Sequence, residues 1–242
     1  MIKILKNMSP KNIVSQKDGF KRMMIMVFSI LLMGFSVSVF SYSGMGVDPF
    51  TALNMSVSAK LGISFGFWQM CVNGVILIAV ALLSKKLINI GTIFNMVGVG
   101  YVCEFFTGIY DRFLPAENTT AVRLAIMAMG VFLLSLSASL YFNCKLGVSP
   151  YDALGFVLEE KTSIKYKWCR VITDLVCTGI AFLLSGPIGV GTVVTAFLMG
   201  PVVSFCDTRI SQKVIAWKYR FLKNFAVIRY YDLGYISGRY AA

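Results

Sequence analysis

Long apolar blocks constrain this chain more than any other feature of its sequence. An α-helix needs about 20 consecutive apolar residues to cross a hydrocarbon core of about 30 Å. Six blocks approach or reach this length, with approximate bounds 23–42, 67–84, 90–110, 122–142, 168–185 and 189–207. The chain has 242 residues, of which 57% are hydrophobic and 14% charged, too few polar residues for a soluble domain of this size. The sequence therefore predicts an all-α membrane protein with about six transmembrane helices, and a lipid bilayer as its main partner.

The basic residues indicate how the blocks are oriented. The formal net charge is +12, but Lys and Arg gather at the two ends of the chain instead of on one soluble face, so we expect no nucleic-acid partner. Six basic residues precede position 23 and seven follow position 208. Cytoplasmic segments of membrane proteins are enriched in Lys and Arg. Both termini are therefore predicted to be cytoplasmic, which agrees with six spans.

The chain also repeats itself at a spacing of 101 residues. Residues 46–53, G-V-D-P-F-T-A-L, match residues 147–154, G-V-S-P-Y-D-A-L, and after a one-residue deletion 91–92 match 191–192. Each copy holds three predicted spans, and an odd number turns the second copy upside down in the membrane. Such inverted repeats occur in transporters, with the binding site at the midplane where the copies meet.

This repeat predicts five consecutive regions. They are a basic cytoplasmic segment (1–21), membrane repeat one (22–110), an external linker (111–121), membrane repeat two (122–208) and a basic cytoplasmic tail (209–242).

The repeated G-V-[DS]-P motif has the composition of a helix start. Asp48 or Ser149 can cap the helix, and Pro49 or Pro150 fits its first turn. About 12 helical residues would follow, a length of about 18 Å, which is too short to span the membrane. Two arrangements remain open: re-entrant half-helices whose N-termini converge near the midplane, or amphipathic helices on the membrane surface. The re-entrant arrangement would suit a small polar or anionic substrate, because helix N-termini attract negative groups.

Ionisable residues inside the apolar blocks are the next candidates, since a charge in hydrocarbon is costly unless it faces a cavity or a partner. Asp174 lies in the fifth block, where repeat one has Asn73. Arg170 precedes Asp174 by four residues, so the two could form a purely structural ion pair on one helix face. Glu104, in the third block, could serve proton or cation coupling or could be solvated at the interface.

Asn95 could line a cavity or bridge helices, and Thr195 takes its place in repeat two. We expect the short helices to converge on a polar cavity lined by Asn73, Glu104, Asp152 and Asp174. The full set of candidate substrate- or ion-binding residues is Asp48, Asn73, Asn95, Glu104, Asp152, Arg170 and Asp174.

The sequence offers no catalytic or metal-binding pattern. It contains no histidine, no P-loop and no recognisable nucleophile motif, and its six cysteines show no C-x-x-C spacing. We therefore expect neither enzymatic activity nor a bound cofactor or metal.

Three motifs together resemble the YczE/YitT-like bacterial membrane proteins, over residues 22–208. They are G-V-D-P-F-T-A-L-N, F-G-F-W-Q and I-G-T-I-F-N-M-V-G-V-G. In that family the last motif reads G-T-x-x-N with an acid about nine residues beyond the asparagine, and Asn95 and Glu104 match it. Repeat two departs from the pattern, with Thr195 and Ser204 at these positions. The resemblance implies a multi-pass protein of the bacterial cytoplasmic membrane and supplies no activity.

Two functions remain. Inverted repeats, half-helices and intramembrane acids favour a small-molecule transporter or channel. The alternative is a non-transport accessory or scaffold, such as a biosynthetic helper or a substrate-binding subunit, because no energy-coupling motif is present. The oligomeric state is left open.

Overall fold

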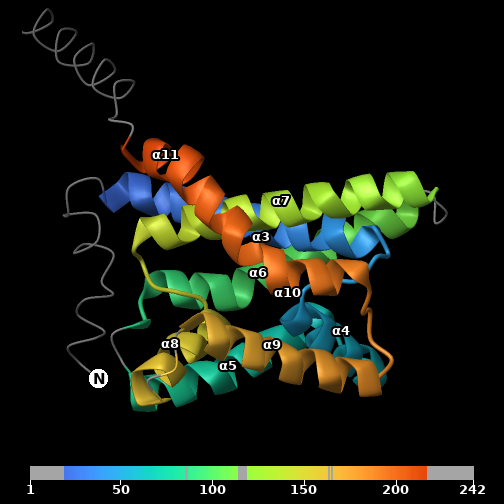
Figure 1. Ribbon diagram of the computed structural model, residues 1–242, viewed down its shortest axis with the longest axis horizontal. Helices are drawn as coiled ribbons and strands as arrows, with labels where there is room; N and C mark the ends of the chain where they lie inside the picture. Colours follow the sequence, from blue (N-terminus) through green and yellow to red (C-terminus); the bar gives the residue numbers. More distant parts are fainter. Residues whose placement is uncertain (1–18, 85–86, 114–118, 163, 165, 217–242) are drawn as a thin grey trace, which may run out of the picture.

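The computed structural model describes residues 19–84, 87–113, 119–162, 164 and 166–216. All regular elements within these residues are helices (Figure 1). Most of the predicted N-terminal segment, part of the predicted external linker and most of the predicted C-terminal tail lie outside the described residues. The side of the membrane that each terminus faces therefore stays a prediction.

Each half of the chain contributes four helices in the same order of long, short, long and long. The first half consists of α3 (Gly19–Tyr42), α4 (Pro49–Leu61), α5 (Phe65–Leu83) and α6 (Ile90–Phe113). The second half consists of α7 (Thr120–Cys144), α8 (Pro150–Thr162), α9 (Tyr166–Leu183) and α10 (Val190–Cys206), followed by a π-helical turn, η2 (Asp207–Ser211), and α11 (Gln212–Ala216).

Five of the described helices are long and apolar enough to cross a membrane. They are α3, α5, α6, α7 and the continuous helix Val190–Ile215. The protein is therefore a multi-pass membrane protein. The sixth predicted span corresponds to α9, whose 18 residues include the charged Lys167, Arg170 and Asp174. Six spans in total stay a prediction.

The last span is longer than the sequence suggested, because its helix continues past residue 207 as η2 and α11. One side chain from α7 and one from α11 hold this extension. The amide Nδ2 of Asn143 donates to Asp207 Oδ1 at 2.5 Å, and Gln212 Nε2 donates to Asp207 Oδ2 at 2.9 Å. These bonds satisfy the carboxylate where the helix widens into a π turn.

The two short helices begin where the repeated motif predicted. The backbone N–H of Thr51 donates to Asp48 Oδ1 at 3.1 Å, which caps α4. The N–H of Asp152 donates to Ser149 Oγ at 3.1 Å, which caps α8 in the same way. Each helix has 13 residues, so neither can span the bilayer.

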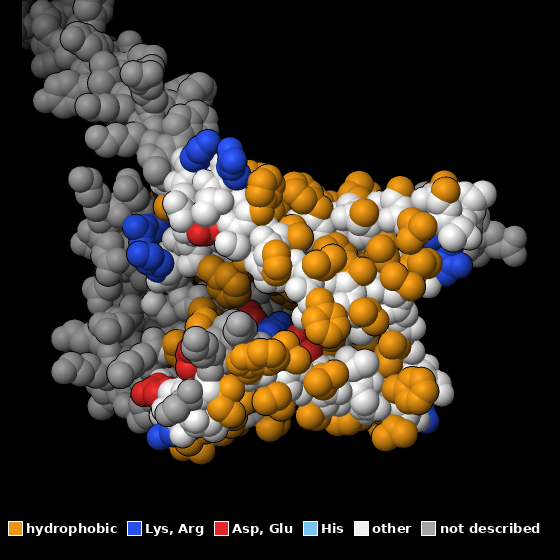
Figure 2. All heavy atoms as spheres, in the orientation of Figure 1, with side chains coloured by type: hydrophobic (Ala, Val, Ile, Leu, Met, Phe, Trp, Pro, Cys, Tyr) orange, Lys and Arg blue, Asp and Glu red, His pale blue; other side chains and the backbone are white. Residues whose placement is uncertain are grey.

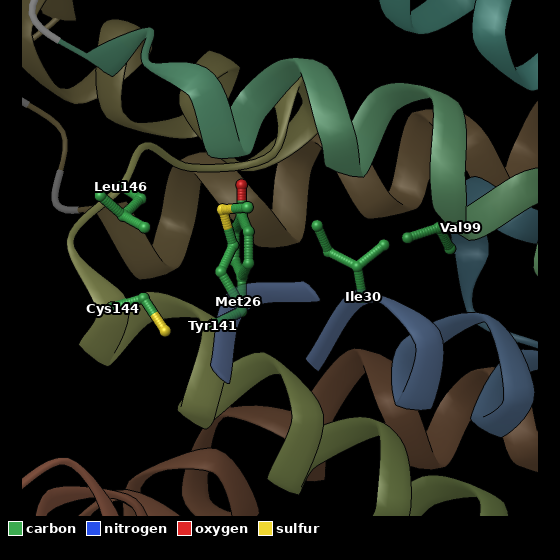
Figure 3. Close-up of a cluster of buried hydrophobic side chains, with 6 residues drawn as sticks. All are labelled: Met26, Ile30, Val99, Tyr141, Cys144 and Leu146. Atoms are coloured by element: carbon green, nitrogen blue, oxygen red, sulfur yellow. The ribbon is translucent and has the colours of Figure 1, made fainter. Parts of the chain in front are cut away.

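The helices α3 and α7 pack against each other as an antiparallel pair. Near the start of α7, Arg123 Nε donates to the carbonyl oxygen of Ser43, just past the end of α3, at 2.8 Å. Gly130 lets the two helices approach closely, since a Cβ there would lie 2.9 Å from Phe40 Cα. At the opposite end, Met26 of α3 packs with Tyr141 of α7 in a buried cluster (Figure 3).

In each half, the turn before the short helix binds the start of the last long helix of the other half. The N–H of Gly91, at the start of α6, donates to Leu146 O in the turn before α8 at 2.8 Å. The N–H of Gly191, at the start of α10, donates to Met45 O in the turn before α4, also at 2.8 Å. A second pair of bonds recurs in the same way, from Val47 N to Pro187 O at 3.2 Å and from Val148 N to Leu87 O at 3.4 Å. The sequence repeat is thus matched by a repeat in the contacts.

Candidate functional site

The first turns of α4 and α8 meet inside the molecule. The rings of Phe50 and Tyr151, which occupy equivalent positions in the sequence repeat, stack with 4.2 Å between centroids and 13° between planes. From this contact the two helices run towards opposite ends of the bundle (Figure 1). Their first turns are buried and their last residues are exposed. The first turns of the two short helices therefore converge inside the bundle.

A cavity of about 960 Å³ lies beside these first turns. Its wall combines polar residues with apolar ones from α3, α6 and α7, such as Val37, Val99 and Leu134. Figure 2 shows acidic and basic side chains in a hollow between α10 and the α8–α9 pair. Six of the seven candidate residues line it: Asp48, Asn73, Asn95, Asp152, Arg170 and Asp174.

Arg170 of α9 is the centre of the charged part of the wall. Its guanidinium forms an ion pair with Asp152 Oδ1 of α8 and places Nε 3.6 Å from Asp174 Oδ2 on its own helix. It also lies over the ring of Tyr151, 4.3 Å from the centroid. The Tyr151 hydroxyl donates to Asp174 Oδ1 at 2.7 Å. The expected pairing of Arg170 with Asp174 is therefore present, but Asp152 is the closer partner.

Two amide side chains of α5 present buried oxygen atoms that have no hydrogen-bond partner within the described protein. They are Gln69 Oε1 and Asn73 Oδ1, and the two residues are 6% and 4% exposed. An unpaired buried acceptor is destabilising by about 1–3 kcal/mol, so such atoms need a reason. Both residues also contribute to the wall of the cavity.

Glu104 does not line the cavity, which corrects its expected place there. Its Oε2 accepts hydrogen bonds from Ser64 Oγ at 2.6 Å and from the backbone N–H of Gly66 at 3.2 Å. The first turn of every helix leaves N–H groups without intrahelical partners, and a carboxylate satisfies them well. Glu104 of α6 therefore fixes the start of α5.

Asn95 and its counterpart Thr195 behave differently. Asn95 is buried and lines the cavity, with Nδ2 3.5 Å from the sulfur of Met33. Thr195 also lines the cavity, but its hydroxyl donates to carbonyl oxygens of its own helix, 3.0 Å from Gly191 O. The amide is thus the more available polar group of this pair.

Sequence reasoning did not select three residues that contribute to the site. Tyr151 stands inside the repeated motif, and its hydroxyl was the available signal, because the first copy has Phe50 there. Gln69 matches Arg170 in the repeat, so its position was visible but its unpaired oxygen was not. Asp207, also on the cavity wall, lay at the predicted end of a span. Among the described residues, no group of three or more Cys, Asp or Glu side chains is arranged to hold a metal ion.

Several bacterial proteins are similar to this chain along most of their length. YczE of Bacillus subtilis, described as a membrane protein, is 29% identical over 177 residues, which are 73% of this chain and 80% of YczE. YyaS of the same organism is 28% identical over 178 residues, covering 71% of this chain and 85% of YyaS. A protein of Haemophilus influenzae is 25% identical over 186 residues, covering 77% and 83%.

No solved structure is significantly similar to the chain. The resemblance to YczE expected from the three motifs is confirmed, and the relatives support a bacterial membrane location. A family model described as a family of unknown function, DUF6198, matches residues 20–208, which run from the second residue of α3 past the end of α10. The chain therefore belongs to the DUF6198 family of membrane proteins.

Proposed function

We propose that this protein is a transporter or channel for small molecules in the bacterial cytoplasmic membrane. Its two halves act as inverted repeats, and substrate binds in the cavity beside the first turns of α4 and α8. The proposal assigns six spans, with α9 as the sixth, and places both termini in the cytoplasm. An odd number of spans in each half then gives the halves opposite orientations.

The recurring contacts between the halves support the inverted repeat. The bond from Gly91 to Leu146 is the counterpart of the bond from Gly191 to Met45, and α3 runs antiparallel to its counterpart α7. Half-helices that end near the membrane centre are a common device of transporters built from inverted repeats. They leave irregular backbone at the midplane, which is tolerated only where it is buried or lines a cavity.

The cavity is the observation that carries the proposal. Its volume of about 960 Å³ is near the upper end of the range of about 300–1,000 Å³ that is usual for small-molecule sites. Ionisable groups inside a membrane domain usually mark a substrate or ion pathway. Here Asp152, Arg170 and Asp174 gather on one wall, while Gln69 and Asn73 offer unpaired oxygens.

Thiol labelling from each side of the membrane tests transport without knowledge of the substrate. The exposed native Cys71 is replaced by serine, and a cysteine is introduced by Ala196→Cys on the cavity wall. A charged, membrane-impermeant thiol reagent is then applied to right-side-out and to inside-out vesicles. We expect labelling from both sides, because the pathway opens to both sides during turnover.

Val75→Cys is the matched control, since Val75 lies near the middle of α5, is 69% exposed outside the cavity and faces lipid in the proposed orientation. It should resist the polar reagent from either side. Labelling of Ala196→Cys from one side only, or from neither, contradicts transport through this cavity and favours an accessory role.

A further inference from the structure

We infer that the cavity binds an amphiphilic amine, with its ammonium head beside Asp48 and its hydrocarbon chain directed out between α9 and α10. The inference rests on the proposed function in that it assigns a substrate class to the same cavity. Four observations lead to it: the charge of the wall, the state of the helix N-termini, the unpaired acceptors and the position of the mouth.

The charges on the cavity wall favour a cation. Four aspartates line the cavity, Asp48, Asp152, Asp174 and Asp207, whereas its basic residues are Lys145 and Arg170. Two of these aspartates already neutralise the guanidinium of Arg170. Asp48 lies beside the stacked first turns and feels the charge of Arg170, but the ion pairs of the described residues join Arg170 to Asp152 and Asp174. An ammonium group there would gain a charge-assisted hydrogen bond.

The helix N-termini, which favoured an anionic substrate at the level of sequence, are already capped. The Asp48 carboxylate accepts from the N–H of Thr51, and the Ser149 hydroxyl accepts from the N–H of Asp152. The negative charges of Asp48 and Asp152 also lie at the positive ends of α4 and α8 and offset them. An incoming anion would therefore meet a carboxylate at the start of each short helix.

The unpaired groups of the wall are acceptors. Gln69 Oε1 and Asn73 Oδ1 are buried, lie one turn apart on α5 and lack a donor within the described protein. An ammonium head has three N–H donors and no acceptor, so it complements the Asp48 carboxylate, and it satisfies an amide oxygen only if that amide turns towards the cavity, because neither oxygen is exposed to it. A carboxylate or phosphate ligand would leave both amide oxygens unsatisfied.

The mouth of the cavity lies on the side of the bundle. Trp168 of α9 and Phe197 of α10 line the cavity and are 55% and 65% exposed, so they stand at its opening. The opening lies on the flank of the bundle, beside the start of α9 and the middle of α10 (Figure 2). In a membrane-spanning bundle such a side faces lipid. The inner wall at Val37, Val99 and Leu134 is apolar, so both the wall and the mouth suit a hydrocarbon chain.

Quenching of tryptophan fluorescence can test this binding with the full chain in lipid nanodiscs. Three probes separate the two parts of the ligand: 11-bromoundecylamine, 11-bromoundecanoic acid with the same chain and the opposite charge, and 3-bromopropylamine with the same head and almost no chain. Bromine quenches an indole on contact, and Trp168 lies at the mouth. We expect saturable quenching by the long amine alone, and loss of that saturable component in Trp168→Phe.

Asp48→Asn is the decisive variant, because asparagine caps a helix as well as aspartate and removes only the charge. We expect it to weaken binding of the long amine about tenfold or more, the usual effect of losing a hydrogen bond to a charged group. Asp111→Asn, which removes an exposed carboxylate outside the cavity, is the matched control and should bind like the unmodified protein.

Each contrary result removes a defined part of the inference. Equal quenching by the long acid, or unchanged binding in Asp48→Asn, overturns the cationic head, and equal saturation by the short amine overturns the chain. Two-sided labelling of Ala196→Cys without amine-selective quenching overturns this inference and leaves transport standing. Amine-selective quenching without two-sided labelling contradicts transport and leaves the inferred ligand class standing.

Discussion

Phe50 and Tyr151 are equivalent in the sequence repeat and stack on each other with 4.2 Å between ring centroids. The stack joins the two half-helices through matching residues, but the two sides differ in chemistry. The Tyr151 hydroxyl reaches Asp174, whereas Phe50 has no polar group to offer the equivalent Asn73. A symmetric scaffold therefore carries an asymmetric site, whose ion-pair network belongs to the second half.

The network around Arg170 predicts a rescue by double substitution. Arg170→Gln should lower the free energy of unfolding by about 1–3 kcal/mol, because two partly buried aspartates lose their cation. Adding Asp174→Asn should restore part of that loss. The measurement is unfolding by titration with SDS in mixed micelles. A strictly additive double substitution would show that the pair does not interact.

The same variants separate structure from function at Asp174. If Asp174 takes part in substrate binding, Asp174→Asn should leave a folded protein with weakened binding of the bromoalkylamine, and the double variant should not regain it. Full recovery of both stability and binding in the double variant would leave Asp174 with a structural role only.

The turn glycines should tolerate no side chain. Gly46 and Gly147 have φ of 95° and 108°, and a Cβ on Gly147 would lie 2.5 Å from Thr92 Oγ1. Alanine at either site should lower stability by about 2 kcal/mol or more, from the left-handed backbone and the contact together. Gly74→Ala is the control, with an open position in the middle of α5, and should raise stability by about 0.5–1 kcal/mol. Equal effects in SDS titration at Gly46 and Gly74 would contradict the docked turn.

The hydrogen bonds of Glu104 at the start of α5 predict an effect on stability and none on ligand binding. Glu104→Gln should leave amine binding unchanged, since Glu104 lies outside the cavity and the amide oxygen still accepts from Ser64. Glu104→Ala should lower stability by about 0.5–2 kcal/mol, as for loss of a helix cap. Stability is measured by SDS titration and binding by the bromoalkylamine assay. Loss of binding in Glu104→Gln with normal stability would instead support a coupling role for this acid.

Membrane topology has its own test. Thr119 and Lys213 are exposed and lie at predicted external and cytoplasmic positions. With Cys71 replaced by serine, an impermeant thiol reagent on intact cells should label Thr119→Cys and not Lys213→Cys. Inside-out vesicles should give the opposite pattern. The reversed result would invert the topology.

The sequence predicted the long helices and the starts of the short ones because the determining interactions are local. Apolar length defines a span, and a capping residue followed by proline defines a helix start, as at Asp48-Pro49 and Ser149-Pro150. The extension beyond Cys206 could not be predicted, because it depends on Asn143 of another helix meeting Asp207.

The sequence selected six residues that line the cavity, but not the contacts between them. Arg170 and Asp174 share a helix face, so their contact follows from a spacing of four residues. The contact of Arg170 with Asp152 spans 18 residues and depends on how α8 and α9 pack. Glu104 was expected in the cavity as an acid inside a span, and the sequence does not indicate that the start of α5 lies beside it.

The exchange of turns between the halves also has a consequence for biogenesis. Met45 O accepts a hydrogen bond from Gly191, which lies in the last span to be synthesised. Leu146 O accepts its hydrogen bond from Gly91, which has already been synthesised when residue 146 is made. The first half therefore leaves the translocon with its turn undocked. The native contacts of this turn form only after α10 has been translated. A nascent chain stalled after α7 therefore lacks them in its first half, even when the helices of that half are fully inserted.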